Sequence, residues 1–537
     1  MKFKIIIFAC GSLLFFNLLY SQNITNTIGT NGIFKIKGES SDYLTLSQST
    51  GYLSLNTSLN LQNTTGSTIG VIFKGPDRFI HNYGIENTFI GVNSGNFTMT
   101  GFQNTALGEN TLSLNTTGNQ NTALGLFSLF LNTTGSYNTA LGTFSLYKNT
   151  TGSNNTGLGT NSLYFNIAGS NNTALGSHSL YFNSNGSYNT AIGSNTLRSN
   201  TTGSYNTALG IYSLYSNSTG IYNTALGSSL AFNTTGSNNT AVGYGSLYNS
   251  TTGSNNSALG FNSLWNNSTG YSNTAIGLSS ISNNTTGFEN TAVGNVCLAR
   301  NTTGWHNTAV GDSALYNNIV GFQNTAVGHH SLVNNTGNYN TAVGHNSGST
   351  ITTGVNLTCI GIDANPSSPT ANDQITLGNQ FVSSLRCNVQ SITSLSDARD
   401  KKNITELSLG LEFITKLQPR QFNWDKREWY DDNFSDGSKM NDEPTAGFIA
   451  QELDSAQTSA GAEWLNLVLK DNPDKWEATY GNLLPVMVKA IQELKSENDM
   501  LKDKLAKFEE MQSVLAGEIE KMKSTNYSIK EVKLTEK

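Results

Sequence analysis

The sequence predicts a mainly β protein: a shaft of 17-residue repeats wound as a β-solenoid or β-roll, then a small α+β domain and a C-terminal helical coiled coil. Three observations predict this order. A five-residue motif recurs over residues 87–361, charged residues gather after residue 395, and heptad spacing begins at Ile491. Residues 87–395 carry nine charged side chains, whereas 47 of the 66 in the chain follow residue 395. Two physically different parts therefore meet near Ser396.

Composition and charge exclude several classes of function. The 537 residues carry a net charge of −6 and have an isoelectric point near 5.6, which gives no positive surface for nucleic acid. Aromatic residues make up 10% of the chain, too many for a disordered polar sequence. No metalloprotease, serine-hydrolase or phosphate-loop motif occurs, and the few carboxylates of the low-charge part lie far apart in sequence. We therefore expect no cofactor, no metal site and no enzyme activity on other molecules.

The first 22 residues have the pattern of a secretory signal peptide. Two lysines precede an apolar run over residues 5–19, and the small residue Ser21 follows it. A run of about 15 residues is shorter than the ~20 that span a bilayer, which disfavours the alternative of a signal anchor. No later segment is apolar enough to cross a membrane. We therefore expect export to the cell surface or the extracellular space.

Cleavage after this segment removes Cys10 and leaves three cysteines in the mature chain. Cys297, Cys359 and Cys387 are widely spaced, so they form neither a disulfide framework nor a zinc-binding pair. We expect them to be small, buried apolar side chains.

Residues 23–86 are predicted to form a β-rich N-terminal cap. Apolar and polar residues alternate over residues 43–47 and 52–56, which is the pattern of half-buried strands. No residue pattern in this segment indicates chemistry, so its expected role is to cover the repeats or to attach the chain.

Residues 87–361 consist of a 17-residue repeat, which predicts a solenoid. The motif Asn-Thr-Ala-(Leu, Val or Ile)-Gly, with small variations, begins at Asn87, Asn104, Asn121, Asn138, Asn155, Asn172, Asn189, Asn206, Asn223, Asn239, Asn256, Asn273, Asn290, Asn307, Asn324 and Asn340. Two steps are 16 residues long, and residues 358–361 are a last, degraded copy. Each unit holds two short apolar stretches, which Gly or Asn-Thr clusters end before a helix can form. We therefore predict two strands and two turns per coil.

The residue types predict which side chains lie inside each coil. We expect the small Ala of the motif to point into a narrow interior, and its Leu or Ile together with the Ser-Leu-Tyr stretch to face outward. Asn side chains are expected to stack and to bond one another from coil to coil. Calcium-binding repeats need acidic residues that are absent here, and the Thr-Thr pairs needed for an ice-binding ladder lie beside turn glycines. Stacked Asn side chains are therefore the preferred interpretation.

A single thin coil would leave its outer Leu, Tyr and Phe side chains in water, which predicts lateral packing of identical chains. Three chains side by side would cover these side chains, so we expect a homotrimer. The repeat resembles the head repeats of trimeric autotransporter adhesins, whose Asn-Ser/Thr-x-Ala-x-Gly units stack into β-rolls. The units of that family are usually shorter than 17 residues. The resemblance therefore applies to the stacking of short repeats and not to their register.

Residues 362–395 are interpreted as a β connector and residues 396–490 as a small charged domain. Four motifs define this part: Ser-Asp-Ala-Arg-Asp-Lys-Lys-Asn-Ile from 396, Leu-Gln-Pro-Arg-Gln-Phe-Asn-Trp from 417, Gly-Phe-Ile-Ala-Gln-Glu-Leu from 447, and Tyr-Gly-Asn-Leu-Leu from 480. Together, in this order and spacing, they resemble the intramolecular chaperone domain at the C-terminus of phage endosialidases and tail spikes. That family includes bacterial tail-fibre-like surface proteins and the eukaryotic myelin-regulatory-factor type.

The resemblance implies self-cleavage by a Ser-Lys serine peptidase. It makes Ser396 the nucleophile, Lys401 the general base and Leu395–Ser396 the scissile bond, with Lys402 as the alternative base. A hydroxyl needs such a base, and a lysine serves only where burial or nearby cations lower its pKa from about 10.4. Trimer assembly would provide this burial. Some members have a histidine where this chain has Thr445, and its absence would weaken cleavage. The alternative is a strand-to-helix cap with a solvated run of charges and no cleavage.

Residues 491–523 are predicted to form a coiled coil, followed by a tail over 524–537. Steps of three and four residues connect Ile491, Leu494, Asn498, Leu501, Leu505, Phe508, Gln512, Leu515, Ile519 and Met522. This spacing makes one apolar seam, and Glu and Lys residues occupy the remaining faces. Polar side chains at seam positions would fix the register and the number of strands, and a parallel trimer matches the expected shaft.

The function that this organisation favours is a secreted or cell-surface, adhesin-like homotrimeric fibre. Its C-terminal domain would act as an intramolecular trimerisation chaperone and then cut itself away. The expected partners are the other two chains and, as ligand, a surface glycan or a matrix component. One alternative is a phage-type tail fibre that binds host glycans, against which the signal peptide argues. The other is a structural fibre that is never cleaved.

Overall fold

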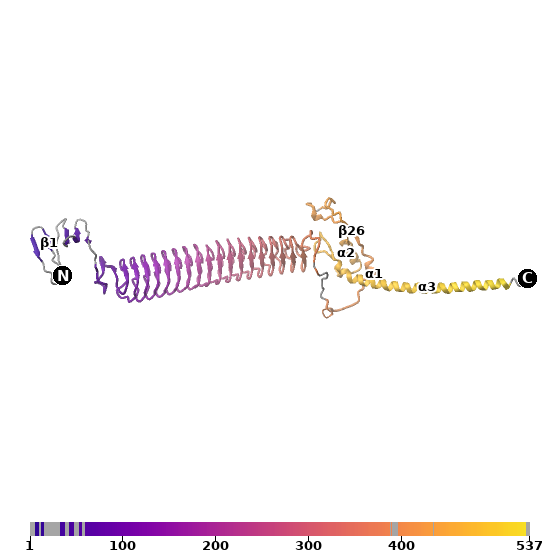
Figure 1. The fold of residues 1–537 in the computed structure, drawn as a ribbon, viewed down its shortest axis with the longest axis horizontal. Coiled ribbons are helices and arrows are strands. Elements are labelled where there is room, and N and C mark those ends of the chain that lie inside the picture. The colour runs from indigo at the N-terminus through magenta and orange to yellow at the C-terminus, as the bar shows by residue number, and fades with distance from the viewer. Residues whose placement is uncertain are drawn as a thin grey trace. The chain divides into compact units, whose positions relative to one another are not determined.

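The computed structural model of the chain is drawn in Figure 1. It describes residues 6–9, 12–15, 33–37, 42–47, 53–55, 60–386, 388, 396–432 and 434–532. The chain divides into two compact units, Met1–Glu289 and Asn290–Lys537. Their elements confirm the predicted fold class: a mainly β chain with a β-solenoid of 17-residue repeats, a small α+β region and a long C-terminal helix. Most of the predicted signal peptide lies outside the described residues.

Antiparallel strands precede the repeats in the first unit. They are the pair β1 (Ile6–Ala9) and β2 (Ser12–Phe15), the three-stranded sheet β3 (Ile33–Lys37), β4 (Asp42–Ser47) and β5 (Leu53–Leu55), and the hairpin β6 (Ile72–Lys74) and β7 (Asp77–His81). β7 pairs antiparallel with the first repeat strand, β8 (Thr88–Ile90). The hairpin thus covers the backbone edge that the first coil would otherwise expose.

Each repeat contributes one three-residue strand, which we call a rung. In the first unit the rungs are β8, β9 (Thr105–Leu107), β10 (Thr122–Leu124), β11 (Thr139–Leu141), β12 (Thr156–Leu158), β13 (Thr173–Leu175), β14 (Thr190–Ile192), β15 (Thr207–Leu209), β16 (Thr224–Leu226), β17 (Thr240–Val242), β18 (Ser257–Leu259) and β19 (Thr274–Ile276). In the second unit they are β20 (Thr291–Val293), β21 (Thr308–Val310), β22 (Thr325–Val327), β23 (Thr341–Val343), β24 (Thr358–Ile360) and β25 (Ile375–Leu377). β25 lies in the segment interpreted as a connector.

Neighbouring rungs are parallel and in register, so each repeat position forms a column. In the β10–β11 pair, for example, Ala123 lies opposite Ala140 and Leu124 opposite Leu141. Ala123 is 1% exposed, whereas Leu124 is 44% exposed. This alternation confirms that the Ala points inward and the following Leu outward, as the period of a strand requires.

The second apolar stretch of the repeat differs from its prediction. It is a turn and not a strand, and its Ser and Leu side chains point inward: Ser145 and Leu146 are fully buried. Leu146 has a left-handed backbone (φ 52°), and its N–H donates to the carbonyl oxygen of Ser162 in the next coil at 2.9 Å. The left-handed residue bends the chain, which brings Leu over the small Ala and fills an interior that Ala alone would leave empty. Only the aromatic residue of the stretch, such as Tyr147, faces outward.

Two columns of buried Asn side chains connect the coils, as predicted. The Asn121 side-chain amide donates to Asn104 Oδ1 at 3.0 Å, and that of Asn132 donates to Asn115 Oδ1 at 2.8 Å. Both amides also donate to the carbonyl oxygen of Gly135, at 3.0 and 2.9 Å. The repeat therefore satisfies its own turn carbonyls from inside the coil, where water does not reach them.

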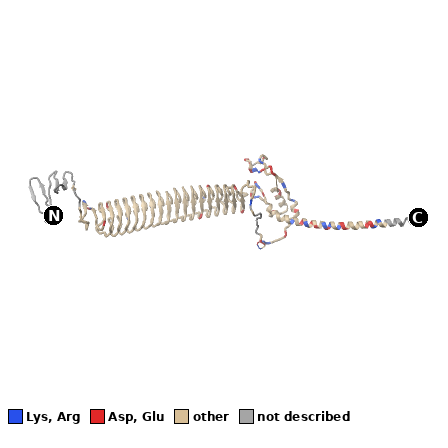
Figure 2. Cartoon of the chain, in the orientation of Figure 1, with Lys and Arg blue, Asp and Glu red and all other residues tan. Residues whose placement is uncertain are grey.

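The repeats are almost free of charge, as their tan colour in Figure 2 shows, and each rung from β8 to β24 turns one Thr or Ser and one aliphatic side chain outward, for example Thr122 and Leu124. Outward Leu, Ile and Val side chains are joined by aromatic columns in which rings stack from coil to coil. The ring centroids of Tyr188 and Tyr205 are 4.9 Å apart, and those of Tyr205 and Tyr222 are 5.0 Å apart. In one chain these side chains are largely exposed.

Two cysteines lie inside the coils, as expected, and Cys387 is outside the described residues. Burial raises the pKa of the Cys297 thiol to about 12 and that of Cys359 to about 11.

We expect the chain from residue 23 with Cys387→Ser to leave Ellman's reagent unreacted at about pH 8, because roughly one thiol in a thousand or fewer is ionised. After denaturation two thiols per chain should react, and reaction in the folded state would contradict the burial.

The C-terminal region is a small α+β fold with its own core. Its elements are η1 (Ala398–Asp400), α1 (Leu411–Ile414), β26 (Arg420–Phe422), η2 (Arg427–Trp429), β27 (Thr445–Gly447), α2 (Ala450–Ser459), η3 (Glu463–Leu465), β28 (Val468–Leu469), β29 (Glu477–Ala478), η4 (Tyr480–Leu483) and α3 (Leu484–Val532). Its core comprises Phe413, Leu417, Leu453, Ala462, Leu465, Leu467, Val468, Leu483 and Val486.

The long helix α3 has two parts with different surroundings. Its first turns join the core, and Glu493 accepts a hydrogen bond of 2.6 Å from the N–H of Leu411 at the start of α1. Further along, the apolar side chains of the predicted seam are exposed in the single chain: Ile491, Leu494, Leu501, Leu505, Phe508, Leu515, Ile519 and Met522. The helix is confirmed, and its pairing with other chains stays a prediction. Among the described helices, none combines the length and the hydrophobicity that crossing a membrane requires.

Candidate functional site

The predicted dyad forms within one tight turn. Asp397 precedes the 3-10 helix η1, and its carboxylate accepts a hydrogen bond of 2.8 Å from the N–H of Arg399. The N–H of Lys401 then donates to the carbonyl oxygen of Ala398 at 3.2 Å, which ends the turn. This turn brings the Nζ of Lys401 into a hydrogen bond with the Oγ of Ser396. The five-residue spacing of the two side chains is therefore enough to bring them together.

The neighbouring charges of this turn are paired with each other. Arg399 and Asp397 form an ion pair with an N–O distance of 2.6 Å. Hydrogen bonds from Arg399 hold the pKa of the Asp397 carboxyl below its usual range, and the same pair raises the pKa of the guanidinium. The Asp397 carboxylate is thus paired with Arg399, and the side chain of Lys401 bonds to Ser396 instead. Ser396, Lys401 and the alternative base Lys402 are exposed, and Leu395 lies outside the described residues.

Three other motifs of the sequence analysis pack against one another. β26 and β27 pair antiparallel, with Gln421 opposite Ala446, and join the motif that begins at 417 to the one at 447. Arg420 of the first motif donates two hydrogen bonds to the Glu452 carboxylate of the second, at 3.0 and 2.7 Å. Such a bidentate pair holds two planar groups in a defined orientation.

The motif at 480 is attached through a tyrosine. Tyr480 Oη accepts a hydrogen bond of 3.1 Å from the N–H of Phe448, and the two ring centroids are 5.5 Å apart. A Cβ on Gly447 would lie 2.9 Å from this hydroxyl oxygen and 3.2 Å from the ring of Phe422, so a larger residue would require the Tyr480 hydroxyl to shift. These motifs are evident from the sequence but their contacts are not; the opposite charges of Arg420 and Glu452 were the available signal.

Thr445 occupies the position where some relatives carry a histidine. It lies in β27 opposite Phe422 of β26. Among the residues that the structure describes, no hydrogen bond links Thr445 to Ser396 or Lys401. The dyad therefore forms here without a contribution from this position.

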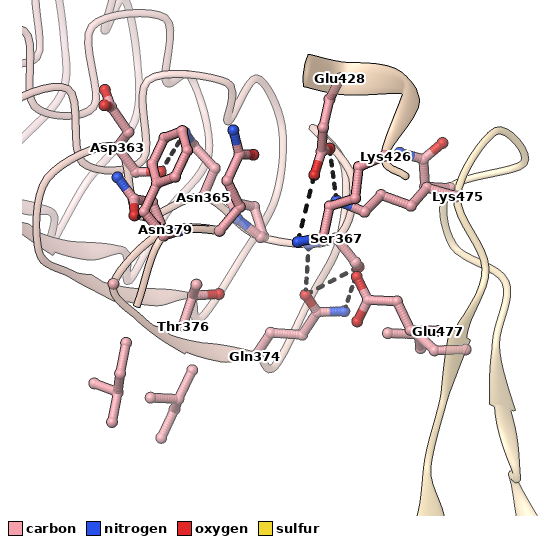
Figure 3. A pocket seen from close by; sticks show the side chains of 18 residues that line it. Asp363, Asn365, Ser367, Gln374, Thr376, Asn379, Lys426, Glu428, Lys475 and Glu477 are labelled. Atoms are coloured by element: carbon pink, nitrogen blue, oxygen red, sulfur yellow. Dashed lines mark hydrogen bonds and ion pairs between the residues drawn. The ribbon is translucent and has the colours of Figure 1, made fainter. Parts of the chain in front are cut away.

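A polar cavity of about 950 Å³ separates the last rung from the charged domain (Figure 3). Gln374, beside β25, donates to Ser367 Oγ at 2.7 Å and to Asp471 Oδ2 of the domain at 3.0 Å. On the domain side, Lys475 donates to Glu428 at 2.9 Å. No local sequence pattern predicts these residues, because the contacts join segments about a hundred positions apart. They connect the end of the second unit's rungs directly to the folded domain.

Comparison with known families assigns part of this region. Residues 396–462 match the family described as chaperone of endosialidase. This segment is similar to that family. No curated protein and no solved structure matched the chain. The endosialidase-chaperone segment, residues 396–462, begins at Ser396, contains the motifs at 417 and 447, and ends before the motif at 480. The likeness of the repeats to adhesin heads remains a prediction.

Proposed function

We propose that the chain is an exported homotrimeric fibre whose C-terminal domain registers the three chains, guides the folding of the β-solenoid and then cuts the Leu395–Ser396 bond. The observation that carries the cleavage is the hydrogen bond from Lys401 to Ser396, at the first residue of the endosialidase-chaperone segment. An intramolecular chaperone for a fibrous β-solenoid is the role that this family match supports.

The fold has a need for such a chaperone. Each rung pairs only with strands from other coils, and parallel in-register pairing is slow to form and leaves edges exposed meanwhile. A domain that folds independently and contacts the last rung gives the coils a surface on which stacking can begin. The contact from Gln374 to Asp471 supports this role.

Two exposed apolar surfaces support the trimer. One is the seam of α3, where side chains such as Leu501 are exposed, and the other consists of the outward aliphatic and aromatic columns of the repeats. A heptad seam of this length is stable only against other helices. Three parallel copies of α3 would bury the seam and bring three shafts together in one register.

The dyad supports a self-contained reaction. Ser396 Oγ attacks the carbonyl carbon of Leu395 and gives its proton to the neutral amine of Lys401. The ammonium returns this proton to the amide nitrogen of Ser396 as the C–N bond breaks, which leaves an ester between the Leu395 carbonyl and Oγ. One water then hydrolyses the ester into the Leu395 carboxylate and the free hydroxyl. Burial of the exposed Lys401 on assembly would favour its neutral form and make cleavage depend on the trimer.

The experiment compares intact masses and denaturing gels of the wild-type full chain with Ser396→Ala, Lys401→Ala and Lys402→Ala. We expect wild type and Lys402→Ala to release a fragment whose first residue is Ser396, and the other two variants to stay intact. Lys402 is the matched control, because it is an exposed lysine one position further on.

Two results would change the proposal. Cleavage in Lys401→Ala but not in Lys402→Ala would transfer the role of base to Lys402. Uncut wild type that light scattering shows to be trimeric would refute self-cleavage, and the domain would then be a permanent trimerisation cap. A surface glycan or a matrix component as the ligand of the fibre is part of the same proposal, and a phage-type tail fibre that binds host glycans is the competing one.

A further inference from the structure

Three side chains that can ligate a metal gather on the surface of the second unit. The candidate ligand atoms of Asp312, His329 and His330 all lie within 4.8 Å of one another. His329 Nε2 is 3.6 Å from Asp312 Oδ2, and the centroids of the two imidazole rings are 3.9 Å apart. We call these residues the His-Asp cluster.

The stacking of the coils positions this cluster. Asp312 and His329 each follow the glycine that ends a rung, so they occupy the same column in successive coils. The N–H of His330 donates to the carbonyl oxygen of Asp312 at 2.9 Å, and its left-handed backbone (φ 55°) points its ring to the same side. The next residue of the column, His345, stacks on His329 with ring centroids 5.0 Å apart. The register of the coils therefore brings the three residues together without an ion.

The cluster departs from the composition of the repeats. Three of the six histidines of the chain, His329, His330 and His345, lie within 17 positions, and Asp312 is one of nine charged residues between 87 and 395. In other coils the same two columns hold mostly Ser, Thr, Asn and aromatic residues. The interior pattern of the solenoid does not require histidine or aspartate here, since both columns face outward.

The surroundings keep the carboxylate ionised and oriented. Asn295 donates to Asp312 Oδ1 at 2.6 Å and the Ser313 hydroxyl donates to Oδ2 at 3.1 Å. These hydrogen bonds, helped by the nearby histidines, lower the pKa of the Asp312 carboxyl. Such neighbours orient a ligand and strengthen its binding to a metal. Two imidazoles and one carboxylate are a donor set that suits Zn²⁺, with further positions open to water.

We propose that Asp312, His329 and His330 bind one divalent cation of the zinc class and so tie the coil of Asp312 to the next coil. This site differs from the expectation of no metal, since the ligands are 17 and 18 positions apart and match no metal-binding motif. Only the solenoid register brings them together. The competing outcome is a plain ion pair between Asp312 and a protonated His329.

The test is calorimetric titration of the untagged full chain with zinc chloride near neutral pH. The variants are Asp312→Asn and His330→Asn, and the repeat itself shows that both are tolerated: Asn295 and Asn346 occupy the same columns. His178→Asn is the matched control. His178 has the repeat position and left-handed backbone of His330 (φ 57°) but pairs with Asn161 and Ser177 instead of a carboxylate.

We expect wild type and His178→Asn to bind one zinc per chain. Asp312→Asn and His330→Asn should lose at least about tenfold in affinity, since even residues behind the ligands are worth 10- to 100-fold. Thermal unfolding without zinc should be the same for all four proteins, which separates lost binding from lost folding, and zinc should raise the midpoint of the two binding proteins only. Absence of saturable binding by wild type would leave only the ion pair. Equal affinity of wild type and Asp312→Asn, or loss of binding in His178→Asn, would also overturn the assignment.

Discussion

Asn206→Asp is expected to destabilise the shaft by about 3–5 kcal/mol, because it places an unpaired charge inside the coil. The Asn206 amide donates to Asn189 Oδ1 at 3.1 Å and to the carbonyl oxygen of Gly220 at 2.8 Å. A carboxylate of the same shape loses both bonds and turns an oxygen toward two acceptors. Only the two bonds that Asn223 donates to Oδ1 would survive.

Asn185→Asp is the matched control, since Asn185 is exposed at a turn of the same shaft. We expect it to change stability by no more than about 0.5 kcal/mol. Hydrogen exchange of the coils around each site, together with thermal unfolding, measures both effects. Because the coils interact mainly with their neighbours, the loss of protection should centre on the coil that carries residue 206. Equal effects of the two substitutions would show that the buried Asn column is not what stabilises the stack.

Replacing two seam residues of α3 should convert the trimer to single chains. Leu501 and Leu505 are 63% and 57% exposed in one chain, and the proposed trimer would bury both. The double variant Leu501→Asp and Leu505→Asp puts six charges into that interface, each at a cost that the lost apolar burial cannot offset. In the Ser396→Ala background, which keeps every chain uncut, light scattering should report a mass about one third of that of the Ser396→Ala parent. With Ser396 intact, the fragment that begins at Ser396 should disappear as well, if assembly is what buries the lysine.

The matched control places the same charges away from the seam. Met500→Asp and Ala506→Asp also replace exposed apolar residues of α3 but fall at positions that face away from the seam. We expect this variant to keep the trimer mass and the cleavage. A trimer that survives the seam substitutions would show that the shafts associate without α3, and a chain of single mass in wild type would refute the trimer itself.

Features that repeat along the chain could be predicted from the sequence, and features that depend on a single contact could not. The 17-residue spacing of Asn104, Asn121 and the later copies predicts the buried Asn columns, because a side chain inside a narrow coil meets its own copy in the next coil. The left-handed turn at Leu146 was missed, since an apolar Ser-Leu-Tyr stretch has the composition of a strand. In the C-terminal part, the pairing of Ser396 with Lys401 was implied by the resemblance to the endosialidase chaperone domain, and a hydrogen bond joins the two side chains.

Contacts across long stretches of sequence carry no local signal. Gln374 and Asp471 meet only because the last rung and the domain fold beside each other. The same holds for Asp312 and His329, whose spacing has meaning only once the coils are stacked in register. Residue types alone suggest neither pair.

Each coil pairs only with its two neighbours, and this has a mechanical consequence. In the β9–β10–β11 ladder, β10 bonds to β9 before it and to β11 after it. Tension along the stacking direction is therefore carried by these interfaces in series, and the chain would peel away one coil at a time. The peak force is set by a single interface and does not grow with the number of repeats. Additional repeats make such a stack longer and let it absorb more work before it is fully extended. They do not raise the force at which it begins to unfold.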